Sequence, residues 1–223
     1  ALLKVFGSEA QGYVVDEGVQ IYGGMGFSAD TPMDKLYRDS RISRIFEGTN
    51  EINRMLSIDM LLKKAMKGQI DLMSAVQNVM KELADLPEQD NPYEEPLAEA
   101  KWVLARLKKA FLLVAGSAVQ KLMMKLKTEQ EVLLNASDIL IQIYMLESAI
   151  LKTEQLISKQ GEENCAHQIQ LTQLFAHEAV QVTRQAGEEM IFAFVKFSVH
   201  NTVFVAILFD RFSDQYIGNN HVF

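Results

Sequence analysis

The sequence has one cysteine, four prolines and no surplus of positive charge, and each shortage excludes something. Cys165 has no second cysteine to pair with, so an internal disulfide is impossible and a reducing, intracellular compartment fits. The net charge of −7 leaves no basic surface for phosphate contacts, so we expect no nucleic-acid partner. The four histidines are scattered without matching carboxylates, which predicts no metal site: His167, His177, His200 and His221.

Alternating runs of β-branched residues are also scarce, whereas the helix formers Leu, Ala, Met, Lys, Glu and Gln dominate. Apolar residues make up 48% of the chain, enough for a sizeable core. We therefore predict an all-α fold, in which one helical bundle is followed by a second helical bundle.

Three of the four prolines fall in one acidic stretch, residues 85–96. Proline removes a backbone donor and disrupts helix, and the acidic side chains prefer water, so this stretch is predicted to be a linker. The expected domains are a partial helical domain at residues 1–84 and an additional helical domain at residues 97–223.

Glycines and capping residues indicate where the helices begin and end. The first helix should stop at Gly23, the second should start near Thr49 as its N-cap, and residues 34–41 read as a short turn. Apolar residues at three-and-four spacing after the linker predict a packing seam: Leu104, Leu107, Phe111, Val114, Ala118, Leu122 and Leu126. The expected helices cover residues 2–22, 49–67, 70–84, 101–127, 129–159 and 165–197.

The chain opens inside an amphipathic helical pattern, without an initial Met and without the pattern of a signal peptide. We interpret it as part of a longer protein. A part of this kind can hold a catalytic residue without holding a complete active site.

Two segments carry candidate chemistry, residues 20–27 and residues 38–52. In the first, Gly23, Gly24 and Gly26 allow positive φ or a close approach of the backbone to a ligand or a second subunit, although a plain helix stop is the alternative.

In the second segment, Glu47 precedes a predicted helix start. The helix dipole would favour its ionised form by about 0.3–1 kcal/mol. Shielding by the neighbouring Ile45 and Phe46 would act the other way and make it a stronger base. A solvent-exposed carboxylate at a helix start is the alternative.

Together the segments resemble the C-terminal signature of the acyl-CoA dehydrogenases. The matching elements are a Gln-Ile-aromatic-Gly-Gly-x-Gly run at residues 20–26, the pair Arg38-Asp39, and an aromatic-Glu-Gly-Thr run that leads to Ile52. Their order and spacing make the resemblance specific over the first third of the chain.

The resemblance implies that Glu47 removes the α-proton of a fatty acyl-CoA while a hydride passes from the β-carbon to FAD, which gives a trans-2-enoyl-CoA. It implies that Gly48 lies against the substrate. It also implies an electron-transfer flavoprotein as the electron acceptor, a homo-oligomer, and a bacterial cytoplasmic or mitochondrial location. Among the positions that it assigns to FAD, Thr49, Asn50 and Glu51 touch the flavin. The others reach across a subunit interface to a neighbour's FAD: Gln20, Ile21, Tyr22, Gly23 and Gly24.

The family's N-terminal helical domain and middle β-domain are absent from this sequence. Those domains supply most of the FAD and acyl pocket, so we expect residues 1–223 alone neither to bind FAD tightly nor to turn over substrate.

The segment after the linker looks like the added helical domain of the very-long-chain acyl-CoA dehydrogenases and similar bacterial enzymes. Residues 101–127 hold seven basic residues and no acidic one, and residues 129–163 are acidic. Either the two helices pack and balance their charges, or the domain mediates dimerisation or association with an anionic membrane surface. Residues 190–209 are mostly apolar, but Lys196, His200 and Asn201 argue against a membrane span there.

Overall fold

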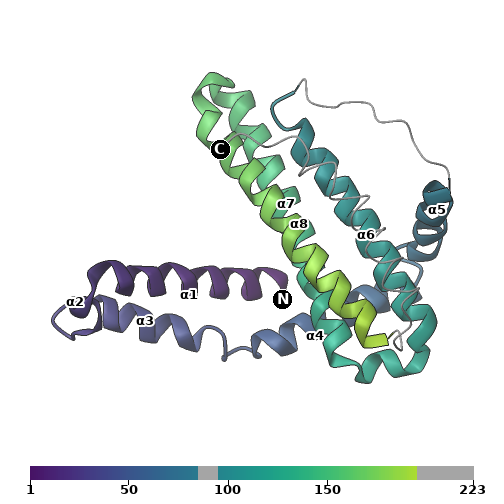
Figure 1. The fold of residues 1–223 in the computed structure, drawn as a ribbon, viewed down its shortest axis with the longest axis horizontal. Helices are drawn as coiled ribbons and strands as arrows, with labels where there is room; N and C mark the ends of the chain where they lie inside the picture. The colour runs from purple at the N-terminus through teal and green to yellow at the C-terminus, as the bar shows by residue number, and fades with distance from the viewer. Residues whose placement is uncertain (85–94, 195–223) are drawn as a thin grey trace. The chain divides into compact units, whose positions relative to one another are not determined.

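The computed structural model describes residues 1–84 and 95–194 (Figure 1). Within these ranges the chain forms helices and no β-strand, which confirms the all-α prediction. It divides into two compact units, residues 1–64 and residues 65–223. Most of the predicted linker, His200, His221 and residues 195–209 of the predicted apolar run lie outside the described residues.

Unit 1 is built from α1 (Leu2–Tyr22), α2 (Gly24–Phe27), α3 (Met33–Ile42) and most of α4 (Asn50–Met66). Helices α1 and α3 lie side by side and run in opposite directions (Figure 1). They approach closely because glycines of α1 leave room for side chains: Met33 packs over Gly18 and the Arg44 guanidinium over Gly12. The predicted end of α1 is confirmed, since Gly23 caps it with φ 59° and its N–H donates to Gln20 O at 3.1 Å.

The prediction of a short turn at residues 34–41 is wrong, because α3 is a helix of 10 residues. Pro32 precedes it with φ −75°, a backbone angle already suited to a helix start. Asp34 in the first turn and Arg41 in the last complement the helix dipole, and Asp34 pairs with Arg38 one turn later at 3.8 Å. The sequence signals for this helix were present in the proline and the order of the charges.

Unit 2 contains a bundle of three long helices, α6 (Ala98–Leu122), α7 (Gln130–Gln160) and α8 (Ala166–Phe194), with α5 (Leu72–Ala84) packed on α6 (Figure 1). The 3-10 helix η1 (Met123–Thr128) joins α6 to α7, and η2 (Glu163–Cys165) joins α7 to α8. The predicted seam is buried in this bundle except at Leu122, which is partly exposed. Cys165 is fully buried at the connection between α7 and α8.

Helix α5 lies in unit 2, whereas the sequence predicted it as the end of the first domain. Val76 and Val79 are buried, and the side chain of Val76 packs against Gly116 of α6 at 3.0 Å from where a Cβ would stand. Sequence periodicity shows that α5 has an apolar face but not which helix covers that face. The domain limits at residues 84 and 97 remain predictions.

Helix α7 is long and apolar enough to cross a membrane, with a mean hydropathy of 1.2 over its most apolar stretch. Its apolar side chains are also the centre of the unit 2 core: Ile139 and Leu146 are almost completely buried. A core helix of a bundle meets the same criterion of length and composition, and we interpret α7 as such a helix.

The basic and acidic helices of unit 2 partly neutralise each other. Lys101 pairs with Glu154 at 2.7 Å and Lys108 with Glu147 at 2.6 Å, so two lysines of α6 meet two carboxylates of α7. The alternative that these helices pack and balance charge is therefore confirmed for this part of α6.

Candidate active site

The turn that joins α3 to α4 has an unusual backbone. Glu47 has φ 56° and Gly48 has φ 82°, so two consecutive residues are left-handed. A side-chain-bearing residue in this region costs about 1–2 kcal/mol, and such outliers gather at functional sites. Among the described non-glycine residues, only Glu47 and Met123 have a positive φ.

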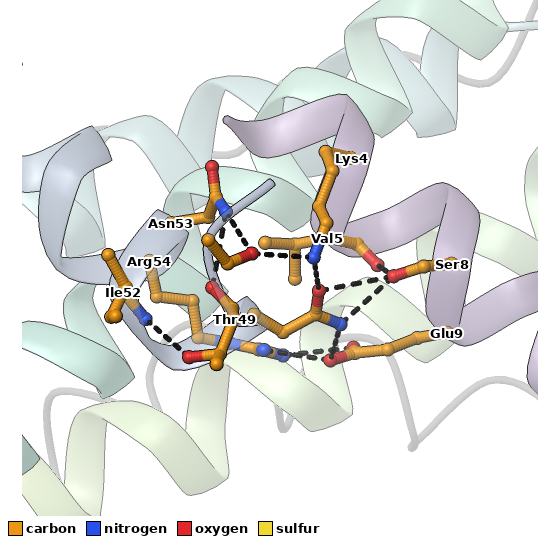
Figure 2. Close-up of polar contacts among 10 residues, drawn as sticks. Lys4, Val5, Ser8, Glu9, Thr49, Ile52, Asn53 and Arg54 are labelled. Carbon is orange, nitrogen blue, oxygen red and sulfur yellow. Dashed lines mark hydrogen bonds and ion pairs between the residues drawn. The ribbon is translucent and has the colours of Figure 1, made fainter. Parts of the chain in front are cut away.

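Two side chains from different helices hold this turn through its carbonyl oxygens (Figure 2). Lys4 of α1 donates from Nζ to Gly48 O at 2.9 Å. Asn53 of α4 donates from Nδ2 to the carbonyl oxygens of Glu47 at 3.3 Å, Gly48 at 2.8 Å and Thr49 at 3.1 Å. The turn therefore has partners on both sides, which compensate for its unfavourable dihedral angles.

Behind the turn lies a second set of polar contacts between α1 and α4 (Figure 2). Asn50, almost fully buried, accepts from Lys4 Nζ at 2.7 Å and donates to Ser8 Oγ and Glu9 Oε1, both at 3.0 Å. Arg54 donates to the two carboxylate oxygens of Glu9 at 2.7 and 2.9 Å.

The charges in this second set explain the ionisation of Glu9. Partial burial raises the pKa of the Glu9 carboxyl, but the hydrogen bond and the charge of Arg54, helped by Asn50, outweigh burial and leave the pKa below its usual value. The carboxylate is therefore ionised at neutral pH and keeps both Arg54 and Asn50 in place.

The start of α4 is capped as predicted. Thr49 Oγ1 accepts from Ile52 N–H at 3.4 Å, the contact expected of an N-cap residue. Hydrogen bonds from its own backbone N–H and from the Thr49 hydroxyl lower the pKa of the exposed Glu51. Negative charge is favoured here because the first turn of a helix presents unpaired N–H groups.

The side chain of Glu47 itself is exposed, and so are its apolar neighbours. Ile45 is 49% and Phe46 is 50% exposed, so within this chain they do not provide the shielding that the sequence allowed for. Among the described residues, the side chains of Ile45, Phe46 and Glu47 therefore all face solvent.

The predicted residues Gln20, Ile21, Tyr22, Gly23 and Gly24 lie at the far end of α1 from the Glu47 turn (Figure 1). Sixteen residues of helix separate Gln20 from Lys4, which is about 24 Å of rise. The structure thus keeps the two predicted groups apart within one chain. The role of residues 20–24 at a neighbouring subunit's FAD remains a prediction.

The glycines at this end of α1 differ in what they require. A Cβ at Gly23 or Gly24 would meet no atom within 4 Å, so the surface there is open. A Cβ at Gly26 would lie 2.5 Å from Val19 O, so Gly26 is needed for α2 to pack on α1. Open space at Gly23 and Gly24 allows a ligand or a second chain to approach their backbone closely.

Sequence reasoning missed the residues that support the turn: Lys4, Ser8, Glu9, Asn53 and Arg54. Lys4 and Ser8 are one helical turn apart, as are Asn50 and Arg54, so each helix shows a short polar stripe in a pattern that is otherwise mixed. These stripes were the available signal.

Other candidate sites are weaker. A hollow of about 540 Å³ opens beside the loop and first turns of α3, lined by residues between 29 and 38, and does not include Glu47. Within the described part of the chain, no three His, Cys, Asp or Glu side chains gather in a way that could hold a metal ion.

The helical fold and the carboxylate-bearing turn match a known class of domain. Two family models, each described as the acyl-CoA dehydrogenase C-terminal domain, match residues 1–62 and residues 106–207. Together they cover most of the chain and both units.

Individual relatives agree with this class. A probable acyl-CoA dehydrogenase of Bacillus subtilis is 44% identical over 86% of this chain and 32% of its own length. The crystal structure of an acyl-CoA dehydrogenase complexed with FAD, from Bacillus anthracis, superposes with a TM-score of 0.89 at 40% identity, over 95% of this chain and 36% of that one. The human mitochondrial very-long-chain specific acyl-CoA dehydrogenase is 54% identical over 25% of this chain and 8% of its own length.

The chain belongs to the acyl-CoA dehydrogenase family and corresponds to the C-terminal part of its members. It spans about a third of the length of the two Bacillus proteins.

Proposed function

We propose that this chain supplies the catalytic base of a flavin-dependent acyl-CoA dehydrogenase that converts fatty acyl-CoA to trans-2-enoyl-CoA. The observation that carries the proposal is the exposed Glu47 carboxylate, presented on a left-handed turn that Lys4 and Asn53 hold from both sides. The α-proton of a thioester is weakly acidic, and a fixed carboxylate is a suitable acceptor for it. FAD, when bound, supplies the acceptor for the hydride from the β-carbon. Gly48, next to the base, is the position that the family resemblance places against the substrate.

Some of the residues predicted to bind FAD are placed where a flavin can contact them, and one is not. Gln20, Gly23 and Gly24 form an exposed surface whose glycines leave open space, as expected where the backbone approaches a cofactor held by a neighbouring subunit. Thr49 and Glu51 lie at the open start of α4. The side chain of Asn50 is engaged inside unit 1, so we infer that it supports this region rather than contacting the flavin directly.

The proposed partners follow from the same assignment. The exposed apolar side chains of Ile21, Tyr22, Met25 and Phe27, from 52% to 86% exposed, suit burial against another copy of the protein. We further infer an electron-transfer flavoprotein as the electron acceptor and an intracellular location, either the bacterial cytoplasm or the mitochondrion. Residues 1–223 alone are expected to purify without bound flavin, which an absorbance spectrum checks.

The experiment is a Glu47→Gln substitution in the full-length protein. Anaerobic mixing with a fatty acyl-CoA should reduce the bound flavin in the wild type and bleach its visible absorbance. The variant should bind flavin normally but reduce it at least about 100-fold more slowly, because a general base contributes roughly 10²–10⁴-fold. Glu17→Gln, an exposed position on α1, is the matched control. Undiminished flavin reduction by Glu47→Gln would refute the proposal.

A second candidate function, association with a membrane surface, is favoured by one observation in unit 2. Met123 and Met124 are 74% and 80% exposed where α6 ends, and three exposed lysines surround them, Lys121, Lys125 and Lys127. Apolar tips among cations suit the interface of an anionic bilayer.

Flotation of the full-length protein with phosphatidylserine-containing vesicles tests this second function. Met123→Glu and Met124→Glu should each weaken binding about tenfold, because burying a methionine side chain is worth about 1.5–3 kcal/mol. Met66→Glu, at a methionine that is 87% exposed elsewhere, is the control. The absence of wild-type binding to anionic vesicles would remove this candidate.

A further inference from the structure

We propose that Lys4 and Asn53 are positioning residues for the base. By holding the carbonyl groups of Glu47 and Gly48 from two sides, they fix the left-handed backbone from which the Glu47 carboxylate projects. The inference rests on the proposed role of Glu47 and adds to it the two side chains through which the protein sets the direction of that base.

The turn requires such support because of its own geometry. With φ at 56° for Glu47 and 82° for Gly48, the backbone is in a region that residues with side chains rarely occupy. Such a conformation persists only where surrounding contacts over-determine it. The Gly48 carbonyl oxygen accepts from both Lys4 Nζ, at 2.9 Å, and Asn53 Nδ2, at 2.8 Å, so it is fixed by two donors.

Asn53 packs directly against the turn. It is 8% exposed, and a Cβ placed on Gly48 would stand 3.1 Å from Asn53 Nδ2. The amide therefore occupies the space that a side chain at position 48 would need. Through its contact with Glu47 O at 3.3 Å, the same nitrogen reaches the backbone of the base itself.

Lys4 is in turn fixed by the polar contacts behind the turn. Its Nζ also donates to Asn50 Oδ1 at 2.7 Å, and the Asn50 amide is oriented by its donation to Glu9 Oε1. Glu9 is held by the two-pronged contact with Arg54. A continuous set of contacts thus runs from Arg54 to the Gly48 carbonyl (Figure 2).

The consequence for catalysis is one of placement. A base displaced by about 1 Å from its productive position loses roughly 100-fold in rate. Removing either donor leaves the Glu47 carboxylate in the protein but allows the turn to relax. The loss should appear in the chemical step rather than in substrate binding.

The test uses the full-length flavin-bound protein with two variants that remove a donor at nearly constant size, Lys4→Met and Asn53→Leu. In anaerobic stopped-flow mixing with saturating acyl-CoA, each should lower the rate of flavin reduction roughly 10- to 100-fold. In steady-state assays, the apparent KM for acyl-CoA should stay within about threefold of wild type. Lys63→Met and Asn164→Leu are matched controls at an exposed ion-paired lysine and at an exposed asparagine that donates to one carbonyl. The controls should react at the wild-type rate.

Two further measurements separate positioning from general support of the fold. Lys4→Arg keeps a cationic donor and should recover a substantial part of the rate lost in Lys4→Met. Combined with Glu47→Asp, which already moves the carboxylate, Lys4→Met should cost less than it does alone, because both changes act on the same group.

The possible outcomes are distinct. A wild-type rate in flavin-bound Lys4→Met and Asn53→Leu, with Glu47→Gln inactive, would overturn the positioning inference and leave the base in place. An active Glu47→Gln would instead refute the proposed function. If either variant fails to retain flavin, Lys4→Leu and Asn53→Ala remove the same donors with different apolar side chains, and wild-type rates in both would equally overturn the inference.

Discussion

Neutralising Glu9 by a Glu9→Gln substitution should loosen the junction between α1 and α4. The glutamine keeps the size of the side chain and an oxygen acceptor, but it removes the charge that binds Arg54 at 2.7 and 2.9 Å. The Asn50 amide, which donates to the same carboxylate, loses a charged acceptor as well.

The magnitude follows from how far the pair is shielded from water. An exposed ion pair is worth about 0–1 kcal/mol, whereas breaking a buried one costs about 3–5 kcal/mol. The side chains of Arg54 and Glu9 are 15% and 40% exposed, which lies between these cases. We therefore expect a loss of about 2 kcal/mol in the local free energy of unfolding, or roughly 30-fold in the opening equilibrium.

The effect should depend on pH in a defined direction. The pKa of Glu9 in the folded protein lies below its usual value of 4.5, so the ionised carboxylate stabilises the folded state. This contribution is fully present above pH 4.5 and is lost as the pH falls through the lowered folded pKa. The wild type and Glu9→Gln should therefore differ most at neutral pH and converge in acid.

Hydrogen exchange measured by mass spectrometry on the full-length protein checks this prediction. Amides of α1 and α4 should lose protection in Glu9→Gln at neutral pH, while Glu17→Gln, on the same helix, should leave them unchanged. Unchanged protection in Glu9→Gln, or a difference that grows as the pH falls, would refute the reasoning about this pair.

Three further substitutions should each give a defined result. Gly48→Ala places a Cβ at φ 82° and 3.1 Å from Asn53 Nδ2, so we expect a loss of about 1–2 kcal/mol, measured by thermal unfolding, together with slower flavin reduction. Gly26→Ala brings a Cβ to 2.5 Å from Val19 O and should displace α2, visible as faster exchange of its amides with a smaller effect on α4. Leu146→Ala, at a fully buried side chain of α7, should destabilise unit 2 by about 2–5 kcal/mol in denaturant unfolding.

Much of the fold could be predicted because the signals are local. Glycine and threonine mark the end of α1 and the start of α4, and apolar spacing marks the core of α6. Helix α3 was missed because its composition is strongly polar, although Pro32 and the ordered charges after it favour a helix start. The location of α5 depends on the fit of Val76 against Gly116, a contact between helices that no local pattern encodes.

The candidate site likewise contains residues that the sequence indicated and residues that it did not. Glu47 and Gly48 stand out through a motif that is contiguous in the sequence. Lys4 and Asn53 do not, because their importance comes from meeting one carbonyl group across a separation of about 50 residues. Nothing in the sequence predicted a left-handed backbone at Glu47, because glycine is the residue type normally expected at positive φ.

The burial of Cys165 provides a natural chemical probe. A thiol reagent cannot reach this sulfur while the turn between α7 and α8 is closed, so the rate of its modification reports how often that turn opens. As the only thiol in these 223 residues, it would register movements of the second unit, in which it lies. The two halves of the chain can thus be followed separately, one by alkylation and the other by flavin colour.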